Sequence, residues 1–404
     1  MKTAVVLFTR DLRVHDNPTL AAASRFFDRV VPVFVVDAGL SVPDNRKRFL
    51  LDSLVDLRAN LRELGGDLAV RRGEVVAEVL RLCEEYDAAG VAMTADYSGY
   101  ATAREKRLTQ ACESKRIGLR VFDGVTVVPP GEVRPSSGGD HYRVFTPYWR
   151  AWSGIGWRDV EATPERVEVP DGFTGDDPAT ALGEAEAESG NQIRGGESEG
   201  LRRWRDWVPD SADYADRHDD LAGDRTSRMS AFLHFGCVSA RQLAGDDRTP
   251  EAFVRQLCWR DFYHQVLAAF PRLNRDAYRR NVEESWHTDS EVLDAWRSGN
   301  TGVDVVDAGM RQLLAQGWMH NRARMITASY LTKTMNLDWR DGAAWFDRWL
   351  IDADVANNYG NWQWTAGTGN DTKPYRKFSP QRQTKRFDPD GEYIARWTGR
   401  TGKP

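Results

Sequence analysis

The chain has 404 residues, which is enough for two domains and more than a single hydrophobic core usually holds. A formal net charge of −5 excludes a globally basic surface, so any contact with nucleic acid has to come from a local patch. The four cysteines have no CxxC spacing, the seven histidines form no cluster, and no signal peptide or membrane-length apolar stretch is present, so we expect a cytoplasmic protein without a disulfide framework or a metal site.

Short apolar segments alternate with helical patterns in the N-terminal part of the chain. Helices are predicted at 46–64, which Gly65 and Gly66 should end, and at 75–86. Strands are predicted at 3–9, 30–36, 67–70, 90–93 and 119–122. Apolar strands that alternate with helices are typical of a parallel sheet covered on both faces, so we predict a doubly wound α/β domain. No GxGxxG motif is present, and NAD binding is therefore not indicated.

A polar loop, Arg10 to Pro18, follows the first predicted strand. Its residues fit an ordinary connection between a strand and a helix, in which Asn17 caps the helix and Pro18 takes the first helical position.

The composition changes beyond the sheet. Residues 171–177 and 183–200 are rich in Gly, Glu, Asp and Ser and poor in large apolar residues, which is typical of a linker. Helical periodicity dominates afterwards, as at 250–269 and 303–315, and all fifteen tryptophans lie at or beyond position 149. We predict an α/β domain at 1–130, a linker at 131–200 and an all-α domain at 201–404.

The stretch from Trp318 to Trp364 combines large aromatic residues with fixed polar positions. Asp352, Asp354 and Asn357 lie in a segment that is otherwise apolar enough to be buried. They could form an exposed acidic cluster at the end of a helix. Buried polar groups need partners, however, and a polar heteroaromatic ligand is one way to supply them.

Five segments together resemble the DNA photolyase/cryptochrome family, and most closely its class I cyclobutane pyrimidine dimer photolyases. They are Phe-Thr-Arg-Asp-Leu-Arg-Val-His-Asp-Asn-Pro (8–18), Thr-Ser-Arg-Met-Ser (226–230), Gln-Leu-Cys-Trp-Arg-Asp-Phe-Tyr (256–263), and the two ends of the Trp318–Trp364 stretch (318–325 and 351–364). Their order along the chain is that of the family. The resemblance implies that the α/β domain is followed by an all-α domain that binds FAD.

The resemblance also implies which residues hold FAD. Residues 226–230 could simply cap a helix, but their counterparts in the family hold the phosphates of the flavin dinucleotide. Asn357 is expected near the flavin N5, and Asp354 is expected to pair with Arg324. The full implied set is Tyr214, Thr226, Ser227, Arg228, Met229, Ser230, Phe253, Gln256, Arg260, Asn321, Arg324, Asp352, Asp354 and Asn357.

Three tryptophans match the family's electron-transfer chain to the flavin: Trp286, Trp339 and Trp362. A single tryptophan is more often a core residue, but all three positions of the chain match. With Asn357 they form the expected catalytic set.

The substrate side depends on the segments 256–260 and 321–325. Trp259 would stack against a pyrimidine pair extruded from the helix, a mode of recognition for which photolyases are a general example. The His-Asn-Arg…Met motif favours cyclobutane dimers over (6-4) photoproducts, although Gln256 stands where cyclobutane enzymes often have Glu. Six basic residues and no acidic one lie between Lys373 and Arg386, which indicates either a solvated loop or a phosphate-binding rim. The expected DNA-contacting residues are Gln256, Trp259, Arg260, Asn321, Arg322, Met325, Trp364, Arg376 and Gln383.

Members of the family often carry a light-harvesting pigment in the α/β domain, 8-hydroxy-deazaflavin or methenyltetrahydrofolate. Residues 96–105 follow a strand at the usual ligand edge of such sheets. We lean to a deazaflavin, but a plain polar loop fits these residues equally well.

The resemblance therefore implies a deoxyribodipyrimidine photo-lyase, a carbon–carbon lyase that acts on UV-damaged DNA. Reduced FAD would give an electron to a cyclobutane dimer under blue light, and the electron would return after the ring splits. The first alternative is a cryptochrome-like photoreceptor without repair activity, and the second is a flavin oxidoreductase. We expect a monomer, and one whose C-terminus is shorter than that of familiar members of the family.

Overall fold

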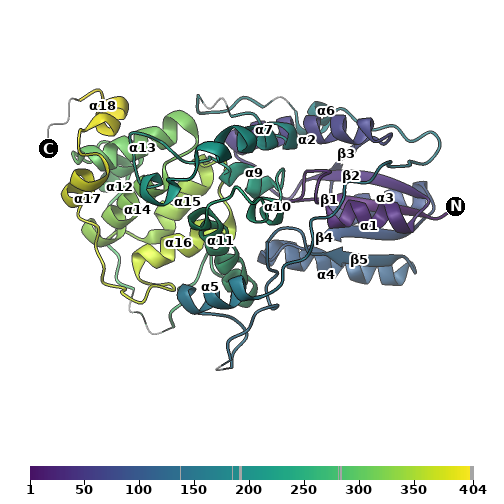
Figure 1. Cartoon of the computed structure of the whole chain (residues 1–404), viewed down its shortest axis with the longest axis horizontal. Helices are drawn as coiled ribbons and strands as arrows, with labels where there is room; N and C mark the ends of the chain where they lie inside the picture. Colours follow the sequence, from purple (N-terminus) through teal and green to yellow (C-terminus); the bar gives the residue numbers. More distant parts are fainter. Residues whose placement is uncertain (137, 184, 191–192, 281, 283, 401–404) are drawn as a thin grey trace.

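A computed structural model describes residues 1–136, 138–183, 185–190, 193–280, 282 and 284–400. An N-terminal sheet with helices on both faces lies at one end of the molecule, and a larger bundle of helices makes up the rest (Figure 1). The predicted order of an α/β part followed by a helical part is confirmed.

Five parallel strands form the sheet in the order β3-β2-β1-β4-β5. They are β1 (Thr3–Phe8), β2 (Arg29–Asp37), β3 (Ala69–Gly73), β4 (Ala88–Thr94) and β5 (Gly118–Phe122). All five predicted strands are present. The strand order reverses between β1 and β4, and the loops that follow these two strands therefore lie beside the crevice where such sheets bind ligands.

Helices cover both faces of the sheet, as predicted. They are α1 (Pro18–Phe26), α2 (Asp44–Glu63), α3 (Val75–Glu85) and α4 (Gly99–Ser114). Val6 and Phe8 of β1 belong to a core that includes residues of α1 and α2, whereas Val5 and Leu7 belong to the core with α3 and α4. The predicted cap of α1 is confirmed, because the Asn17 side chain accepts a hydrogen bond from the Leu20 amide.

The stretch for which the sequence predicted a linker contains helices. Phe145, Tyr148 and Trp152 recur on one face of the first of these helices and are buried in the core that it shares with the helical part. The composition of the segment did not predict this helix, because the residues around it are polar or small. The helices of this stretch are α5 (Phe145–Gly154), α6 (Pro178–Leu182) and the start of α7 (Glu197–Trp207).

The rest of the chain is helical. Its elements are η1 (Val208–Asp210), α8 (Tyr214–Arg217), α9 (Ser230–Phe235), α10 (Ala240–Ala244), α11 (Glu251–Ala269), α12 (Ser290–Arg297), α13 (Asp304–Gln316), α14 (Asn321–Ser329), the π-helical turn η2 (Tyr330–Thr334), α15 (Trp339–Trp349), α16 (Val355–Ala366), α17 (Pro380–Phe387) and α18 (Glu392–Thr398). Helix α16 packs against α11, α14 and α15, and this arrangement places it at the centre of the bundle.

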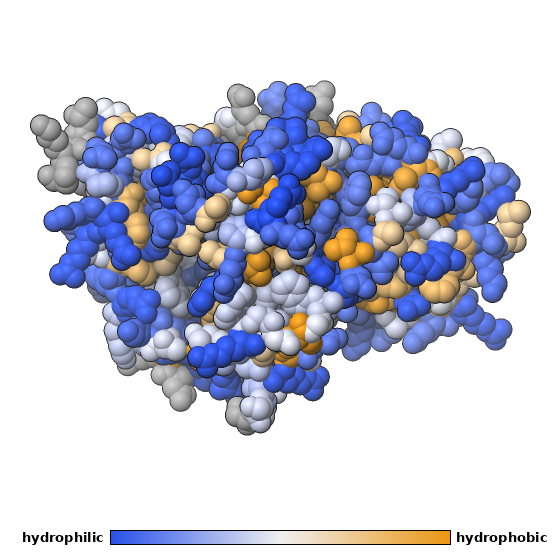
Figure 2. Space-filling model, in the orientation of Figure 1, coloured by the Kyte–Doolittle hydropathy of each residue, from blue (hydrophilic) through white to orange (hydrophobic). Residues whose placement is uncertain are grey.

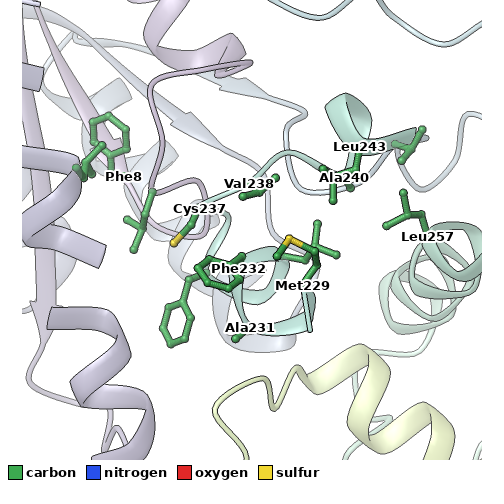
Figure 3. Close-up of a cluster of buried hydrophobic side chains, with 14 of the residues drawn as sticks. Phe8, Met229, Ala231, Phe232, Cys237, Val238, Ala240, Leu243 and Leu257 are labelled. Carbon is green, nitrogen blue, oxygen red and sulfur yellow. The ribbon is translucent and has the colours of Figure 1, made fainter. Parts of the chain in front are cut away.

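One hydrophobic cluster joins the two parts. It runs from Phe8 of β1 through Phe232 and Cys237 to Leu257 of α11 (Figure 3). The face shown in Figure 2 is mostly hydrophilic, with hydrophobic residues scattered over it. Among the described residues, no helix combines the length and apolar character that crossing a bilayer requires.

Candidate active site

A cavity opens between α14, α15 and α16. Its cavity volume is about 100 Å³, and it is open to solvent. The polar side chains that line it are Asn321, Arg324, Asp352, Asn357, Asn358, Asn361 and Thr365, and its larger apolar side chains are Met325, Phe346, Leu350, Trp362 and Trp364. A wall of amides and charges opposite aromatic rings suits a flat heteroaromatic ligand with a polar edge.

Two helix starts position the polar wall. His320 caps α14, because its Nδ1 accepts a hydrogen bond from the amide of Arg322. Asp354 caps α16, because its Oδ1 accepts from the backbone amide of Asn357 and also from the Nδ2 of that residue, both at 2.8 Å. Helical spacing then brings Asn321, Arg324 and Met325 to one wall of the cavity.

The buried carboxylates pair differently from the prediction. Arg324 forms a bidentate pair with Asp352, at 2.8 and 3.1 Å, rather than with Asp354. Asp354 is paired with Arg10, which comes from the loop after β1. The prediction was wrong because Asp354 lies at the domain junction, where a residue 344 positions earlier in the chain reaches it.

The charge on Asp354 is held in place by its neighbours. Burial alone would raise the pKa of Asp354, but the guanidinium of Arg10 holds it well below its usual range. Burial lowers the pKa of His264 to about 4, so this imidazole, 3.7 Å from Asp354, is neutral at physiological pH. Arg10 is therefore the main positive partner of Asp354.

The three tryptophans of the expected chain belong to one core cluster, with Trp286 at its edge. Trp362 lines the cavity, and Trp339 is fully buried. Trp362 packs directly on α15, where a Cβ atom on Gly342 would lie only 2.2 Å from its ring. The indole nitrogens of Trp286 and Trp339 both donate to Glu284, a residue that the sequence analysis did not single out.

The segment 226–230 lies outside the cavity. Thr226 donates to Asp224 at 3.2 Å, and Arg228 pairs with the same carboxylate while its guanidinium lies 4.2 Å from the ring centre of Trp318. The Ser227 hydroxyl accepts a hydrogen bond from the amide of Met229, the residue before α9, at 3.3 Å, and among the described residues no side chain accepts from the first amides of the helix itself. Met229 is buried, and Ser230 is the first residue of α9.

Two residues of the expected FAD set belong to the hydrophobic core. Tyr214 and Phe253 are both buried, with ring centres 5.6 Å apart, and each also packs against Trp207. Neither lines the cavity. Their position is typical of packing residues.

The expected substrate residues of α11 also lie away from the cavity lining. Gln256 is exposed, and Trp259 stacks on Phe145 with ring centres 3.6 Å apart. Arg260 turns inward and donates to the backbone carbonyls of Val125, at 2.6 Å, and Leu233, at 3.2 Å. Its guanidinium therefore joins the two parts of the chain.

A basic rim, residues 373–386, follows α16 in the chain, and one of its residues contacts the cavity lining. Arg376 lies 5.4 Å from the ring centre of Trp364, which is itself part of the lining. Arg322 is already paired with Asp219, at 3.1 Å, and Gln383 on α17 is partly buried. No acidic partner is found within the described chain for the six cations of the rim, which are Lys373, Arg376, Lys377, Arg382, Lys385 and Arg386.

The loop after β4 packs against the helical part. Ser98 caps α4, and a Cβ atom on Gly99 would lie 3.5 Å from the Pro271 carbonyl oxygen. Arg10 links this loop to the cavity, since it lies 3.4 Å from Asp96 and also pairs with Asp354. The sequence analysis missed this link, and it also missed Asn358 and Asn361, whose signal was their spacing of one and four residues from Asn357.

Comparisons with known proteins identify the family to which the chain is similar. Residues 4–168 match the family model described as DNA photolyase, and residues 253–401 match the one described as the FAD binding domain of DNA photolyase. The chain is 50% identical to the deoxyribodipyrimidine photo-lyase of Streptomyces griseus, over 98% of the chain and 89% of that relative. It is 33% identical to a Cryptochrome DASH of Danio rerio, over 98% of the chain and 83% of the relative.

A solved structure shows the same fold. The crystal structure of a bacterial class III photolyase from Agrobacterium tumefaciens superposes with a TM-score of 0.92 and 31% identity, over 98% of this chain and 86% of the other.

Proposed function

The chain belongs to the DNA photolyase/cryptochrome family, and on that basis we propose how its cavity serves the light-driven repair of cyclobutane pyrimidine dimers. It is a DNA-repair flavoprotein and a deoxyribodipyrimidine photo-lyase by its 50% identity to such an enzyme over nearly the whole chain. The observation that carries the proposal is the position of Trp364, which lines the cavity and lies under Arg376, a cation without an acidic partner among the described residues.

The chemistry of the cavity walls suits the ring system of FAD. The Arg324–Asp352 pair offers donors and acceptors to the polar edge of the ring system, and Asn357 and Asn358 add amide groups. Arg228 and the hydroxyls near it would hold the phosphates. When bound in its reduced form, FAD supplies the electron that light moves to the dimer and that returns after the ring has split.

The chain's own residues would bind and orient the damaged DNA. Asn321, Met325 and Trp364 lie in the cavity wall and would contact an extruded pyrimidine pair. The cations of the rim would hold the flanking phosphates. Trp259 and Gln256 lie outside the lining, so we propose that they contact the DNA strand beside the cavity.

The class I assignment is part of the proposal. It is supported by the His-Asn-Arg…Met motif at 320–325, of which Asn321 and Met325 line the cavity. The exposed amide of Gln256 can accept and donate hydrogen bonds but cannot supply a carboxyl proton.

Repair of a dimer-containing oligothymidine decides between this function and a cryptochrome-like photoreceptor. The FAD-loaded protein, reduced beforehand, should restore the absorbance of intact thymines under blue light and should not do so in the dark. Trp364→Ala should lose most of this activity with an unchanged flavin content. An intact dimer after illumination of the wild-type protein would refute repair and favour the photoreceptor.

Three further points are proposals with simple tests. A deazaflavin bound near residues 96–105 would add an absorption band to that of FAD in the purified protein. A monomer would show the mass of a single chain in light scattering. The four buried, unpaired cysteines support a cytoplasmic location, which fractionation of the source cells would test.

A further inference from the structure

The segment 284–287 is fixed beside the start of α15. The amide of His287 donates to the Asn336 carbonyl at 2.8 Å, and the side chain of Asn336 donates back to the Ser285 carbonyl at 3.0 Å. A single parallel β-bridge pairs His287 with Leu337. These contacts place the segment next to Trp339, the first residue of α15.

Glu284 connects the two outer tryptophans of the expected chain. Its Oε2 accepts hydrogen bonds from the indole nitrogens of Trp286, at 3.0 Å, and Trp339, at 3.2 Å. The two nitrogens share one oxygen, so they can be no farther apart than the sum of these distances, 6.2 Å. One carboxylate thus contacts both rings at the atom that becomes most acidic when an indole loses an electron.

The charges around this carboxylate do not cancel. Arg340 donates to both oxygens of Glu284, at 2.8 and 3.0 Å, and also pairs with Asp338 at 3.1 Å. Its guanidinium carbon lies 4.6 Å from the ring centre of Trp339. Hydrogen bonds from Arg340 lower the pKa of Glu284, so the group is ionised at neutral pH. The cluster therefore carries one more negative charge than positive charges.

The inner tryptophan has a different environment. Within the part of the chain that the structure describes, the indole nitrogen of Trp362 has no hydrogen-bond acceptor, and the rings nearest to it belong to Trp296 and Phe346. A positive charge on Trp362 would thus have no carboxylate hydrogen-bonded to its indole nitrogen, whereas one on Trp339 or Trp286 would contact Glu284. An adjacent opposite charge favours a charged group.

We propose that Glu284 is a positioning residue for electron transfer, whose carboxylate stabilises the positive charge on Trp339 and Trp286 and so draws it away from the cavity. The inference rests on the proposed role of the three tryptophans. Trp362 would give one electron to the photoexcited oxidised flavin, Trp339 would refill Trp362, and Trp286 would refill Trp339. A thiol in solution would refill Trp286, losing its proton to water and becoming a thiyl radical. No bond within the chain breaks, and the indole protons stay on their nitrogens, those of Trp339 and Trp286 hydrogen-bonded to Glu284.

Glu284→Gln is the discriminating variant, because an amide oxygen can still accept a hydrogen bond while the charge is lost. Without the carboxylate, Asp338 alone would balance the positive charge of Arg340 over the Trp339 ring. We expect the rate of light-driven flavin reduction by a thiol to fall about tenfold, which corresponds to about 1.4 kcal/mol. Transient absorption should show a tryptophan radical that decays faster than in the wild type, since the charge stays closer to the cavity.

Two controls separate this role from a structural one. Glu291→Gln removes a carboxylate from an exposed position on α12 and should leave both signals unchanged. Arg340→Met removes the cation above Trp339 and should not shorten the radical lifetime. The proposal would be overturned if the tryptophan radical of E284Q decayed at the wild-type rate. It would also be overturned if E284Q and R340M shortened the radical lifetime equally and lowered the melting temperature equally, because that result would indicate a structural role.

The role of Glu284 can be tested even if the proposed repair function is wrong. After chemical reduction of the flavin, dimer repair needs no electron from the tryptophans, so E284Q and the wild type should repair at the same rate. Absence of repair by the reduced wild-type protein would refute the proposed function, and the transient signals would still decide the role of Glu284.

Discussion

The ion pair between Arg10 and Asp354 joins the α/β domain to the first turn of α16, and replacing Arg10 with Met should break it. The Asp354 side chain is only 6% exposed, and the imidazoles of His264 and His234, 3.7 and 4.0 Å away, are neutral because burial lowers their pKa values. The variant would thus leave a buried carboxylate without its main partner. We expect the free energy of unfolding at neutral pH to fall by about 3–5 kcal/mol.

Urea unfolding of the flavin-free protein at pH 7, followed by circular dichroism, measures this loss. Arg25→Met is the matched control, because Arg25 is 64% exposed and lies 3.7 Å from Glu161. Exposed pairs of this kind contribute less than about 1 kcal/mol. The double variant Arg10→Met/Asp354→Asn, which removes both charges, should recover part of the loss.

The loss should also depend on pH with a defined sign. The folded-state pKa of Asp354 is lowered, so in the wild type its stabilisation is fully present above the unfolded-state value of about 3.9 and is lost as the pH falls through the folded-state pKa. Without Arg10 the carboxylate can take up a proton at higher pH, and the difference between the variant and the wild type should shrink on acidification. A loss no larger than that of Arg25→Met, or one that is constant with pH, would refute this account.

Three further outcomes follow from single contacts. Gly342→Ala should lower the free energy of unfolding by about 1–3 kcal/mol and slow light-driven flavin reduction, because the added methyl group would displace the Trp362 ring. Lys377→Ala/Arg382→Ala should reduce the slope of log affinity against log salt for damaged duplex DNA by about 2, with no change in flavin content. Burial raises the pKa of Asp261 to about 6, so the stability of the wild type should fall as the pH rises from about 4 to 6, and in urea titrations Asp261→Asn should lack this component.

Local features of the sheet could be predicted from the sequence. The strands are continuous apolar runs, and the cap formed by Asn17 before Pro18 depends only on neighbouring residues. The same holds for the end of α2, where Gly65 has a positive φ of 85°. Patterns of this kind involve contacts within a few positions along the chain, which is the distance over which a single sequence carries information.

The parts of the site that could not be predicted from the sequence depend on contacts between segments that are distant in the chain. Glu284 and Trp339 are separated by 55 positions, and Arg10 and Asp354 by 344. Arg260 belongs to a recognisable motif, yet its guanidinium donates to two backbone carbonyls at the junction between the domains. Motif resemblance gave the residue types of the cavity, whereas the pairing of charges required the fold.

Asp354 has two structural roles, and together they couple the α/β domain to the cavity. One carboxylate oxygen caps α16 and holds the Asn357 amide, and the other is paired with Arg10. A change that moves the loop after β1 would therefore shift the N-terminus of α16 and the polar wall that it carries. For this reason we expect Arg10→Met to release FAD faster than Arg25→Met does, even under conditions in which both proteins are fully folded.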